Sequence, residues 1–441
     1  MEPPVADPGT DASTVDDVAQ PDVAQPSDAS TDAPLDVADA QGDADSGAPF
    51  VFVHRDINHV LGTGQSLSVG SQGTPFLTTT QPYDNITFVT GVLSGGTGLT
   101  SFIPLVEGDG AGVETLSSSF ANLITKLARE VVFVGGPAGK NGHDLLVSAH
   151  GVGGTAYVGL KKGTAPFTNG MAQVTAGKTL AAAAGKSYVV RAVTNVHGES
   201  DHVAKNAAYQ ANLLEWQKDY ETDVRAMTGQ AEPIPMFETQ ISSWTRYNTT
   251  TSAIPMQQLG AHVAAPGKVI LVGAKYHLEY VTDGVHLTAS GYRHMGEYYA
   301  KAYRRVVLEG KTWEPVRPKT ITRAGAVITV KMHVPVPPLV MDTTLVSDPG
   351  NYGFEFADDS GAAAPAISSV AITGPDTVVI TLAAAPTGAN KRLRYAWTGT
   401  LAARAGATTG PRGNLRDSDA TPSRDGYDLS NWCIHFDDAV P

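Results

Sequence analysis

The chain has 441 residues, of which 31 are Lys or Arg and 44 are Asp or Glu. Twelve of the acidic residues and none of the basic ones lie in residues 1–49. The remainder is therefore close to neutral and gives no reason to expect binding to nucleic acid or an anionic membrane. The single cysteine, Cys433, excludes an intrachain disulfide, and no apolar run approaches the ~20 residues needed to span a bilayer.

Residues 1–49 form a degenerate Asp, Ala, Pro and Gln repeat with almost nothing to bury. This composition predicts a disordered acidic linker that is extended by the repulsion of its own charges. It resembles the stalks of exported bacterial proteins, so we expect a secreted or cell-surface protein whose leader was removed before this numbering begins. The alternative interpretation is a solvated tail with no specific role.

Strand and helix patterns alternate from residue 50 to about residue 312. In chain order they are strand 57–61, helix 115–130, strand 145–149, helix 171–184, strand 187–196, helix 209–227, strands 234–241 and 268–272, and helix 292–306. Aromatic residues recur every three or four positions in the two long late helices, which indicates buried helix faces rather than cofactor contacts. Repeated strand–helix units predict a parallel sheet that helices cover on both faces.

The pattern changes after residue 312, where the helical periodicity stops. Short β-rich runs are separated there by clusters of Gly, Pro, Asp and Asn. This predicts an antiparallel β-sandwich over residues 313–441. We expect an accessory domain that either binds polymer or shields a sheet edge or a cleft.

A glycine-rich turn, GTGQSLSVGSQG, follows the first predicted strand and contains Ser66. Glycines let the backbone turn sharply and leave a serine hydroxyl and its N–H facing a ligand. The Gly-x-Ser-x-Gly pattern of the α/β-hydrolases fails here, because residue 68 is a second serine. The alternative interpretation is a plain Gly/Ser loop.

Asp283 and His286 lie in the sequence DGVH, just before the last predicted helix. A serine hydroxyl is a poor nucleophile until a base removes its proton, and the base works best when a carboxylate holds its tautomer. The spacing allows Asp283 to orient His286 toward Ser66. The alternative is that Asp283 or Thr288 caps the helix and His286 is a surface residue.

Four short blocks occur in a fixed order: GTGQS, LLVSAHGVGGT, HGESD and DGVH. Together they resemble the SGNH (GDSL-like) hydrolases, most closely the sialate O-acetylesterase-like carbohydrate esterases, over about residues 55–305. The resemblance implies a flavodoxin-like three-layer α/β/α hydrolase domain over residues 50–312. It also implies that Ser66 is the nucleophile, His286 the general base and acid, and Asp283 the residue that orients it.

The same resemblance implies an oxyanion hole that contains the backbone N–H groups of Ser66 and of Gly153 or Gly154. Its third donor is less regular, because the carbohydrate esterases have Gln where this chain has His197. We expect His197 to donate, since the ionised carboxylate of Glu199 cannot.

We expect the oxyanion-hole donors to be held in place by three neighbouring residues that do not contact the substrate: Gln65, Glu199 and Asp201. The structural alternative is that HGESD only ties its loop to the neighbouring strand.

These features predict a serine esterase that removes O-acyl groups, and in particular O-acetyl groups, from carbohydrate. The substrate would be an acylated polysaccharide or a small ester. Two alternatives remain open: a lipid or polyester esterase with the same triad, and a carbohydrate-binding surface module with a degenerate hydrolase body. We expect no cofactor, no nucleic-acid partner and no metal, because the chain has no Cys or His-Glu-x-x-His spacing for a zinc site.

Overall fold

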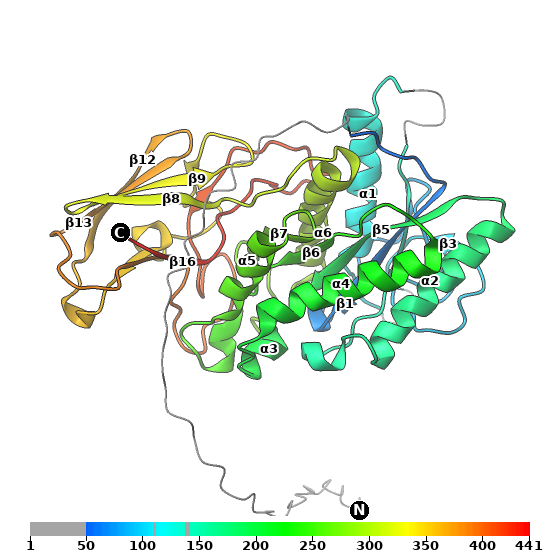
Figure 1. The fold of residues 1–441 in the computed structure, drawn as a ribbon, viewed down its shortest axis with the longest axis horizontal. Helices are drawn as coiled ribbons and strands as arrows, with labels where there is room; N and C mark the ends of the chain where they lie inside the picture. Colours follow the sequence, from blue (N-terminus) through cyan, green and yellow to red (C-terminus); the bar gives the residue numbers. More distant parts are fainter. Residues whose placement is uncertain (1–49, 109–111, 137–141) are drawn as a thin grey trace, which may run out of the picture. The chain divides into compact units, whose positions relative to one another are not determined.

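A seven-stranded sheet with the order β3-β2-β4-β1-β5-β6-β7 forms the centre of the computed structural model, which describes residues 50–108, 112–136 and 142–441 (Figure 1). Its strands are β1 (Ile57–Gly64), β2 (Ile86–Phe88), β3 (Phe102–Pro104), β4 (Leu145–Ala149), β5 (Tyr188–Val196), β6 (Met236–Thr239) and β7 (Val269–Gly273). Neighbouring strands run parallel except β2 and β3, which pair antiparallel at one edge. The predicted linker 1–49 lies outside the described residues.

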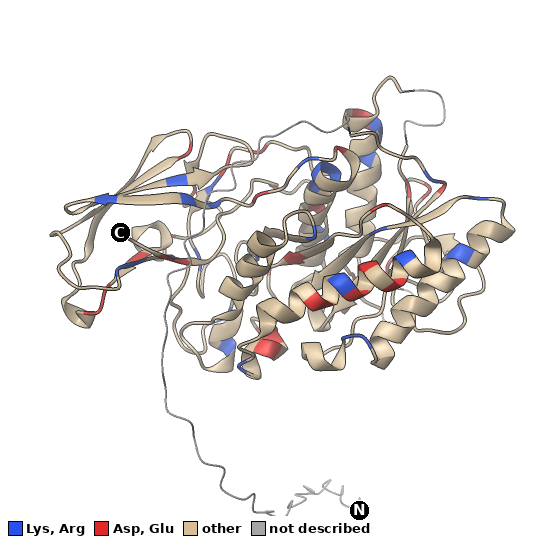
Figure 2. Cartoon of the chain, in the orientation of Figure 1, with Lys and Arg blue, Asp and Glu red and all other residues tan. Residues whose placement is uncertain are grey.

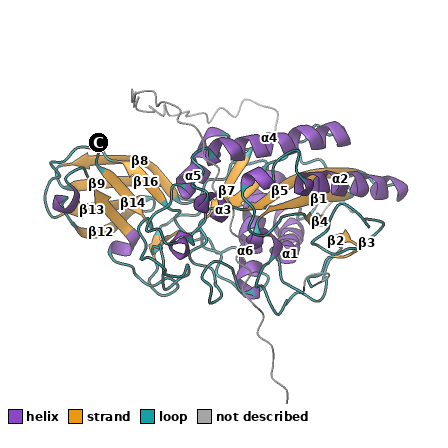
Figure 3. Cartoon of the chain, turned by 90° about the horizontal axis from the view of Figure 1, so that it is seen from below, coloured by secondary structure: helices purple, strands orange, loops and turns teal. Residues whose placement is uncertain are grey.

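Six α-helices accompany this sheet: α1 (Ser117–Leu127), α2 (Ala165–Ala183), α3 (Glu199–Val203), α4 (Tyr209–Thr228), α5 (Ile254–Ala264) and α6 (Ala289–Tyr303). Helices α2, α4 and α5 lie on one face of the sheet, and α1 and α6 lie on the other (Figure 3). Separate hydrophobic clusters fill the two sides, one with residues of α1 and α6 and one with residues of α2, α4 and α5. Because both faces are covered, β1 is buried along its whole length.

The alternation predicted from the sequence is confirmed, with differences at the edges. Helix α2 begins six residues before the predicted start at residue 171, because Pro166 occupies its first turn, where a missing N–H costs nothing. Strands β2 and β3 were not expected from the sequence, since three residues are too few for a visible pattern. No helix in the described part of the chain is long and apolar enough to cross a membrane.

The chain after residue 312 is antiparallel, as predicted. It contains β8 (Arg317–Ala324), β9 (Val327–His333), β10 (Val340–Met341), β11 (Phe354–Ala357), β12 (Ile367–Gly374), β13 (Thr377–Leu382), β14 (Arg392–Tyr395), β15 (Leu415–Arg416) and β16 (Phe436–Ala439). They form a four-stranded sheet β12-β13-β9-β8, a three-stranded sheet β11-β14-β16 and the pair β10-β15. The sandwich packing and the domain boundary at 312/313 stay predictions.

The C-terminal strands share a hydrophobic core with the central sheet, and residues 50–441 form one compact unit. A single cluster contains Phe237 and Ile270 of the central sheet together with Ile328, Leu393 and Phe436 of the C-terminal strands. Residues of both charge signs are interspersed along α4 (Figure 2). This mixture agrees with the near-neutral charge of the chain after residue 49.

Candidate active site

Ser66 lies at the carboxyl end of β1, at the start of a single 3₁₀ turn, Ser66–Val69. The turn is tight because Gly64 has a φ of 125°, and a Cβ there would lie only 2.3 Å from the Val196 carbonyl oxygen. The N–H of Gln65 donates to that same carbonyl at 3.1 Å. Since only glycine fits this approach, the sequence of the turn itself holds Ser66 above the end of β5.

Asp283, His286 and Ser66 form a continuous chain of hydrogen bonds. Ser66 Oγ lies 2.8 Å from His286 Nε2, and His286 Nδ1 lies 2.6 Å from Asp283 Oδ2. The carboxylate accepts the Nδ1 proton, so Nε2 is left as the acceptor for the serine hydroxyl. The loop before α6 therefore brings together residues that are 220 positions apart in the sequence.

The carboxylate of Asp283 remains ionised because its loop surrounds it with donors. Its Oδ1 accepts the backbone N–H groups of Val285 at 2.8 Å and of His286 at 2.9 Å. Burial by itself would raise the pKa of Asp283, but these bonds and the imidazole outweigh that effect and lower the pKa below its usual value. A negative charge is thus maintained beside the His286 ring.

The glycine loop after β4 passes directly over Ser66. Val152 N donates to Gly64 O at 3.0 Å, and Gly151 approaches so closely that a Cβ there would lie 2.1 Å from Ser68 Oγ. A Cβ on Gly153 would lie 3.8 Å from Ser66 Cβ, whereas one on Gly154 would point into open space. Of the two predicted glycines, Gly153 is therefore the one that faces the serine.

His197 is not available as an oxyanion donor, which corrects the prediction. Its ring is fully buried, Nε2 lies 3.0 Å from the Thr155 carbonyl oxygen, and Nδ1 lies 2.8 Å from the hydroxyl of Tyr209. The carbonyl can only accept, so the ring N–H is committed to Thr155. The ring also stacks on Tyr209 and meets Trp216 edge-on, which makes it part of the core.

The residues around His197 hold the HGESD turn in place. Glu199 and Lys275 form an ion pair at 3.1 Å with both side chains 1% exposed. Asp201 accepts the N–H of Tyr157 at 2.8 Å, and Gln65 Oε1 accepts the N–H of Ser200 at 3.0 Å. The HGESD turn is thus tied directly to the residue next to Ser66.

Arg246 is a residue at this site that the sequence did not reveal. Its Nε donates to the Asp283 carbonyl at 2.8 Å and its Nη1 donates to the Ala402 carbonyl at 2.8 Å. Ala405 N also donates to Gly284 O at 3.1 Å. The C-terminal segment therefore braces the loop that carries Asp283 and His286, and no spacing in the sequence signals this contact.

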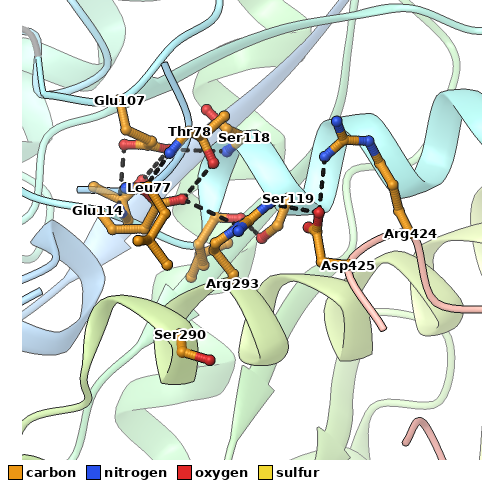
Figure 4. A network of polar contacts seen from close by, with 12 residues as sticks. Leu77, Thr78, Glu107, Glu114, Ser118, Ser119, Ser290, Arg293, Arg424 and Asp425 are labelled. Atoms are coloured by element: carbon orange, nitrogen blue, oxygen red, sulfur yellow. Dashed lines mark hydrogen bonds and ion pairs between the residues drawn. The ribbon is translucent and has the colours of Figure 1, made fainter. Parts of the chain in front are cut away.

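A second polar network braces the chain on the other side of the Ser66 turn (Figure 4). The buried carboxylate of Glu114 accepts the N–H groups of Leu77 at 2.6 Å and Thr78 at 2.9 Å and lies 3.7 Å from Arg293 Nε. Arg293 of α6 in turn pairs with Asp425. The segment after Ser66 is thereby joined to α6 and to the C-terminal region.

A metal site is not apparent in the part of the chain that the structure describes, where no group of three or more His, Cys, Asp or Glu side chains is arranged to hold an ion. A cavity of about 800 Å³ lies at the amino ends of β1 and β4. Ser66 follows the carboxyl end of β1, so this cavity is at the opposite edge of the sheet. It is separate from the candidate active site.

Comparisons with known proteins agree with the geometry. The family model described as "Carbohydrate esterase, sialic acid-specific acetylesterase" matches residues 119–305. A carbohydrate acetylesterase from Xanthomonas citri has the same fold, with a TM-score of 0.55 at 15% identity over 86% of this chain and 80% of that one. No curated protein matches the sequence.

Two further solved structures align with a little over half of this chain. A protein from Arabidopsis thaliana aligns at 16% identity over 57% of this chain and 98% of that one, with a TM-score of 0.42. A carbohydrate acetylesterase from Sinorhizobium meliloti aligns at 11% identity over 56% and 98%, with a TM-score of 0.30. The family match confirms the resemblance to the carbohydrate esterases, and the chain is a carboxylic ester hydrolase.

Proposed function

We propose that this carboxylic ester hydrolase removes O-acetyl groups from carbohydrate through an acetyl-enzyme formed on Ser66. Ser66 Oγ attacks the ester carbonyl carbon while its proton passes to His286 Nε2. The tetrahedral intermediate collapses, the bond to the sugar oxygen breaks, and His286 returns the proton to that oxygen. Water then attacks the acetyl group with His286 as base, and acetate leaves as Ser66 regains its proton.

The observation that carries this proposal is the hydrogen-bonded series from Asp283 through His286 to Ser66, with separations of 2.6 and 2.8 Å. Ser66 is already within the range at which a base can take a hydroxyl proton. The charge of Asp283 stabilises the imidazolium that forms when it does. A capping role alone would not require the imidazole to face the serine.

For the oxyanion we propose the backbone N–H groups of Ser66 and Gly153. The glycine loop faces Ser66, and neither N–H is bonded to another described residue. Donors that point at the developing negative charge each contribute roughly 3 kcal/mol. No side chain takes the place of His197 in this proposal, so the oxyanion hole consists of the two backbone N–H groups.

The order of the parallel strands supports an SGNH-type, flavodoxin-like arrangement. Strands β4-β1-β5-β6-β7 are the second, first, third, fourth and fifth in the chain once the short edge pair β2 and β3 is set aside. Folds with this order bind ligands at the carboxyl end of the first strand, where the order reverses. Ser66 occupies that position.

A sugar substrate is favoured over lipid or polyester by the surroundings of the site. The cavity at Arg246 combines polar side chains, such as His202 and Asn206, with apolar ones, such as Val203 and Ile254, and this mixture suits a sugar, which has polar hydroxyls and apolar C–H faces. The aligned triad also argues against a degenerate, binding-only body. Export to the cell surface, and a role of the C-terminal strands in binding polymer, are proposed from the sequence alone.

The test is acetate release from acetylated polysaccharide and from a small acetyl ester by the parent and by Ser66→Ala. We expect a loss of about a thousandfold or more in kcat, because removal of a nucleophile leaves only binding and the oxyanion hole. Ser71→Ala is the matched control, since Ser71 lies in the same loop without contacting His286. A fluorophosphonate probe should label the parent and not Ser66→Ala. Turnover of Ser66→Ala within a few fold of the parent would refute the assignment.

A further inference from the structure

A cavity of about 600 Å³ opens between α3 and the segment that leads into α5. Its walls include His202, Asn206, Arg246, Tyr247, Asn248 and Gln257. The size suits one or two sugar rings, since ligand pockets of 300–1,000 Å³ are typical for small molecules.

Both walls of this cavity are connected to the proposed catalytic groups. On one side Arg246 holds the carbonyl of Asp283 at 2.8 Å. On the other side, Ser200 lies in the first turn of α3, and its N–H donates to Oε1 of Gln65, the residue before Ser66. Burial, with the charges of Glu199 and Asp283, raises the pKa of the Tyr247 phenol. A molecule in the cavity would therefore contact Arg246, which holds the Asp283 loop, and α3, which is bonded to the residue next to Ser66.

Tyr247 offers the cavity a half-buried aromatic ring. The ring of His202 supports it at a centroid distance of 6.0 Å, and His202 is itself fixed by Ser252 at 2.9 Å and Thr249 at 3.0 Å. The Tyr247 hydroxyl makes no hydrogen bond to another described residue. An amphipathic ring with a free hydroxyl suits a sugar, which has apolar C–H faces and polar edges.

Asn248 occupies a backbone conformation that few residues other than glycine adopt. Its φ is 57°, and Lys205 at the same cavity has a φ of 52°. Asparagine tolerates this conformation better than most residues, and Asn248 uses it to end the 3₁₀ turn Trp244–Tyr247. The exposed amide of Asn248 has no hydrogen-bond partner in the described part of the chain, so it is free to bind sugar hydroxyls.

We propose that this cavity is a subsite for a sugar ring of the carbohydrate substrate, with the Tyr247 ring as its platform and the Asn248 amide as a hydrogen-bonding group. The inference rests on the proposed function and specifies how the enzyme would bind an oligosaccharide differently from a small ester. The oligosaccharide fills the subsite and the small ester does not. Tyr247 and Asn248 are thus specificity residues that leave the chemical step alone.

The test compares an acetylated xylo-oligosaccharide with 4-nitrophenyl acetate. For Tyr247→Ala and for Asn248→Gly, which keeps the left-handed backbone without strain, we expect KM for the oligosaccharide to rise about tenfold with kcat retained. Turnover of 4-nitrophenyl acetate should stay within twofold of the parent. Tyr247→Phe should restore most of the oligosaccharide affinity, because it keeps the ring.

Tyr83→Ala is the matched control, since Tyr83 is a half-buried tyrosine in the larger cavity at the opposite sheet edge. The subsite is refuted if Tyr247→Ala leaves KM for the oligosaccharide unchanged, if both substrates are affected alike, or if Tyr83→Ala gives the effect instead. These outcomes are distinct from failure of the proposed function. If the proposed function itself is wrong, Ser66→Ala would cleave 4-nitrophenyl acetate as well as the parent does.

Discussion

Asp283 uses its two carboxylate oxygens for different tasks. One accepts the backbone N–H groups that shape the loop, and the other accepts the Nδ1 proton of His286. An amide at this position keeps the first task, because its oxygen can still accept. It fails in the second, because its NH₂ group would face Nδ1 and favour the opposite tautomer.

We therefore predict that Asp283→Asn lowers kcat at pH 7 by roughly 10³- to 10⁴-fold, with a melting temperature close to that of the parent. Steady-state kinetics and thermal unfolding monitored by circular dichroism measure the two quantities. Loss of stability in parallel with activity would show that the carboxylate is structural. A kcat within tenfold of the parent would remove Asp283 from the mechanism.

At the residue scale, the structure brings together the three residues that local patterns predicted to meet, whereas the environment of His197 was not predictable from such patterns. Ser66 follows a strand in a glycine turn, and Asp283 and His286 share a four-residue block, so short patterns identify them. The orientation of His197 depends instead on the carbonyl of Thr155 and the hydroxyl of Tyr209, which meet it only in the folded core. No pattern in the chain indicates which way that ring turns.

At the scale of elements, Arg246 joins the loop of Asp283 to the C-terminal segment. We predict that Arg246→Ala lowers kcat for the small ester by roughly tenfold to a hundredfold, because small displacements of a catalytic group are costly. Arg323→Ala is the matched control, since Arg323 also donates to backbone carbonyls, those of Gly325 and Pro441, away from the site. Equal activity of the two variants would show that the Asp283 loop holds its geometry unaided.

Glu107 lies beside Glu114 in the polar network of Figure 4, where its carboxyl group accepts the N–H of Ser118 in α1 at 3.0 Å, and it makes stability depend on pH. Burial, with the neighbouring charge of Glu114, raises the pKa of Glu107 to about 7. The folded protein therefore holds a proton that the unfolded chain releases near pH 4.5, and stability falls as pH rises from about 4.5 to 7.

Glu107→Gln should remove that part of the pH dependence. Chemical unfolding at several pH values should show the free energy of unfolding of the parent falling relative to the variant, by up to about 1.4 kcal/mol per pH unit below pH 7. Above pH 7 the difference should be constant. A difference that is flat from pH 5 to 7 would mean that Glu107 titrates normally.

At the scale of the whole molecule, the shared core argues for joint unfolding of the two predicted regions. Tyr298 of α6 donates to the Ser430 carbonyl at 2.7 Å, and the buried Lys301 pairs with Asp419 at 2.8 Å. Loss of Asp419 would lower the stability of the fold by several kcal/mol, because it would leave the buried charge of Lys301 unpaired. The change from helical periodicity to short β-rich runs after residue 312 was visible in the sequence, but these contacts were not.

We predict that scanning calorimetry of the intact chain shows one cooperative transition for residues 50–441, with calorimetric and van't Hoff enthalpies that agree. The same sample should lose esterase activity within that transition. Two resolved transitions would establish that residues 313–441 fold as an independent domain.

The brace that Arg246 and Gly284 receive from residues 402–405 also has a consequence for biosynthesis. Those residues leave the ribosome more than a hundred positions after His286, so the loop that carries the acid–base pair gains this support only after they have been synthesised. A nascent chain that already contains every proposed catalytic side chain would still lack this support. We therefore expect full hydrolytic activity only after residues 402–405 have been synthesised and have packed against this loop.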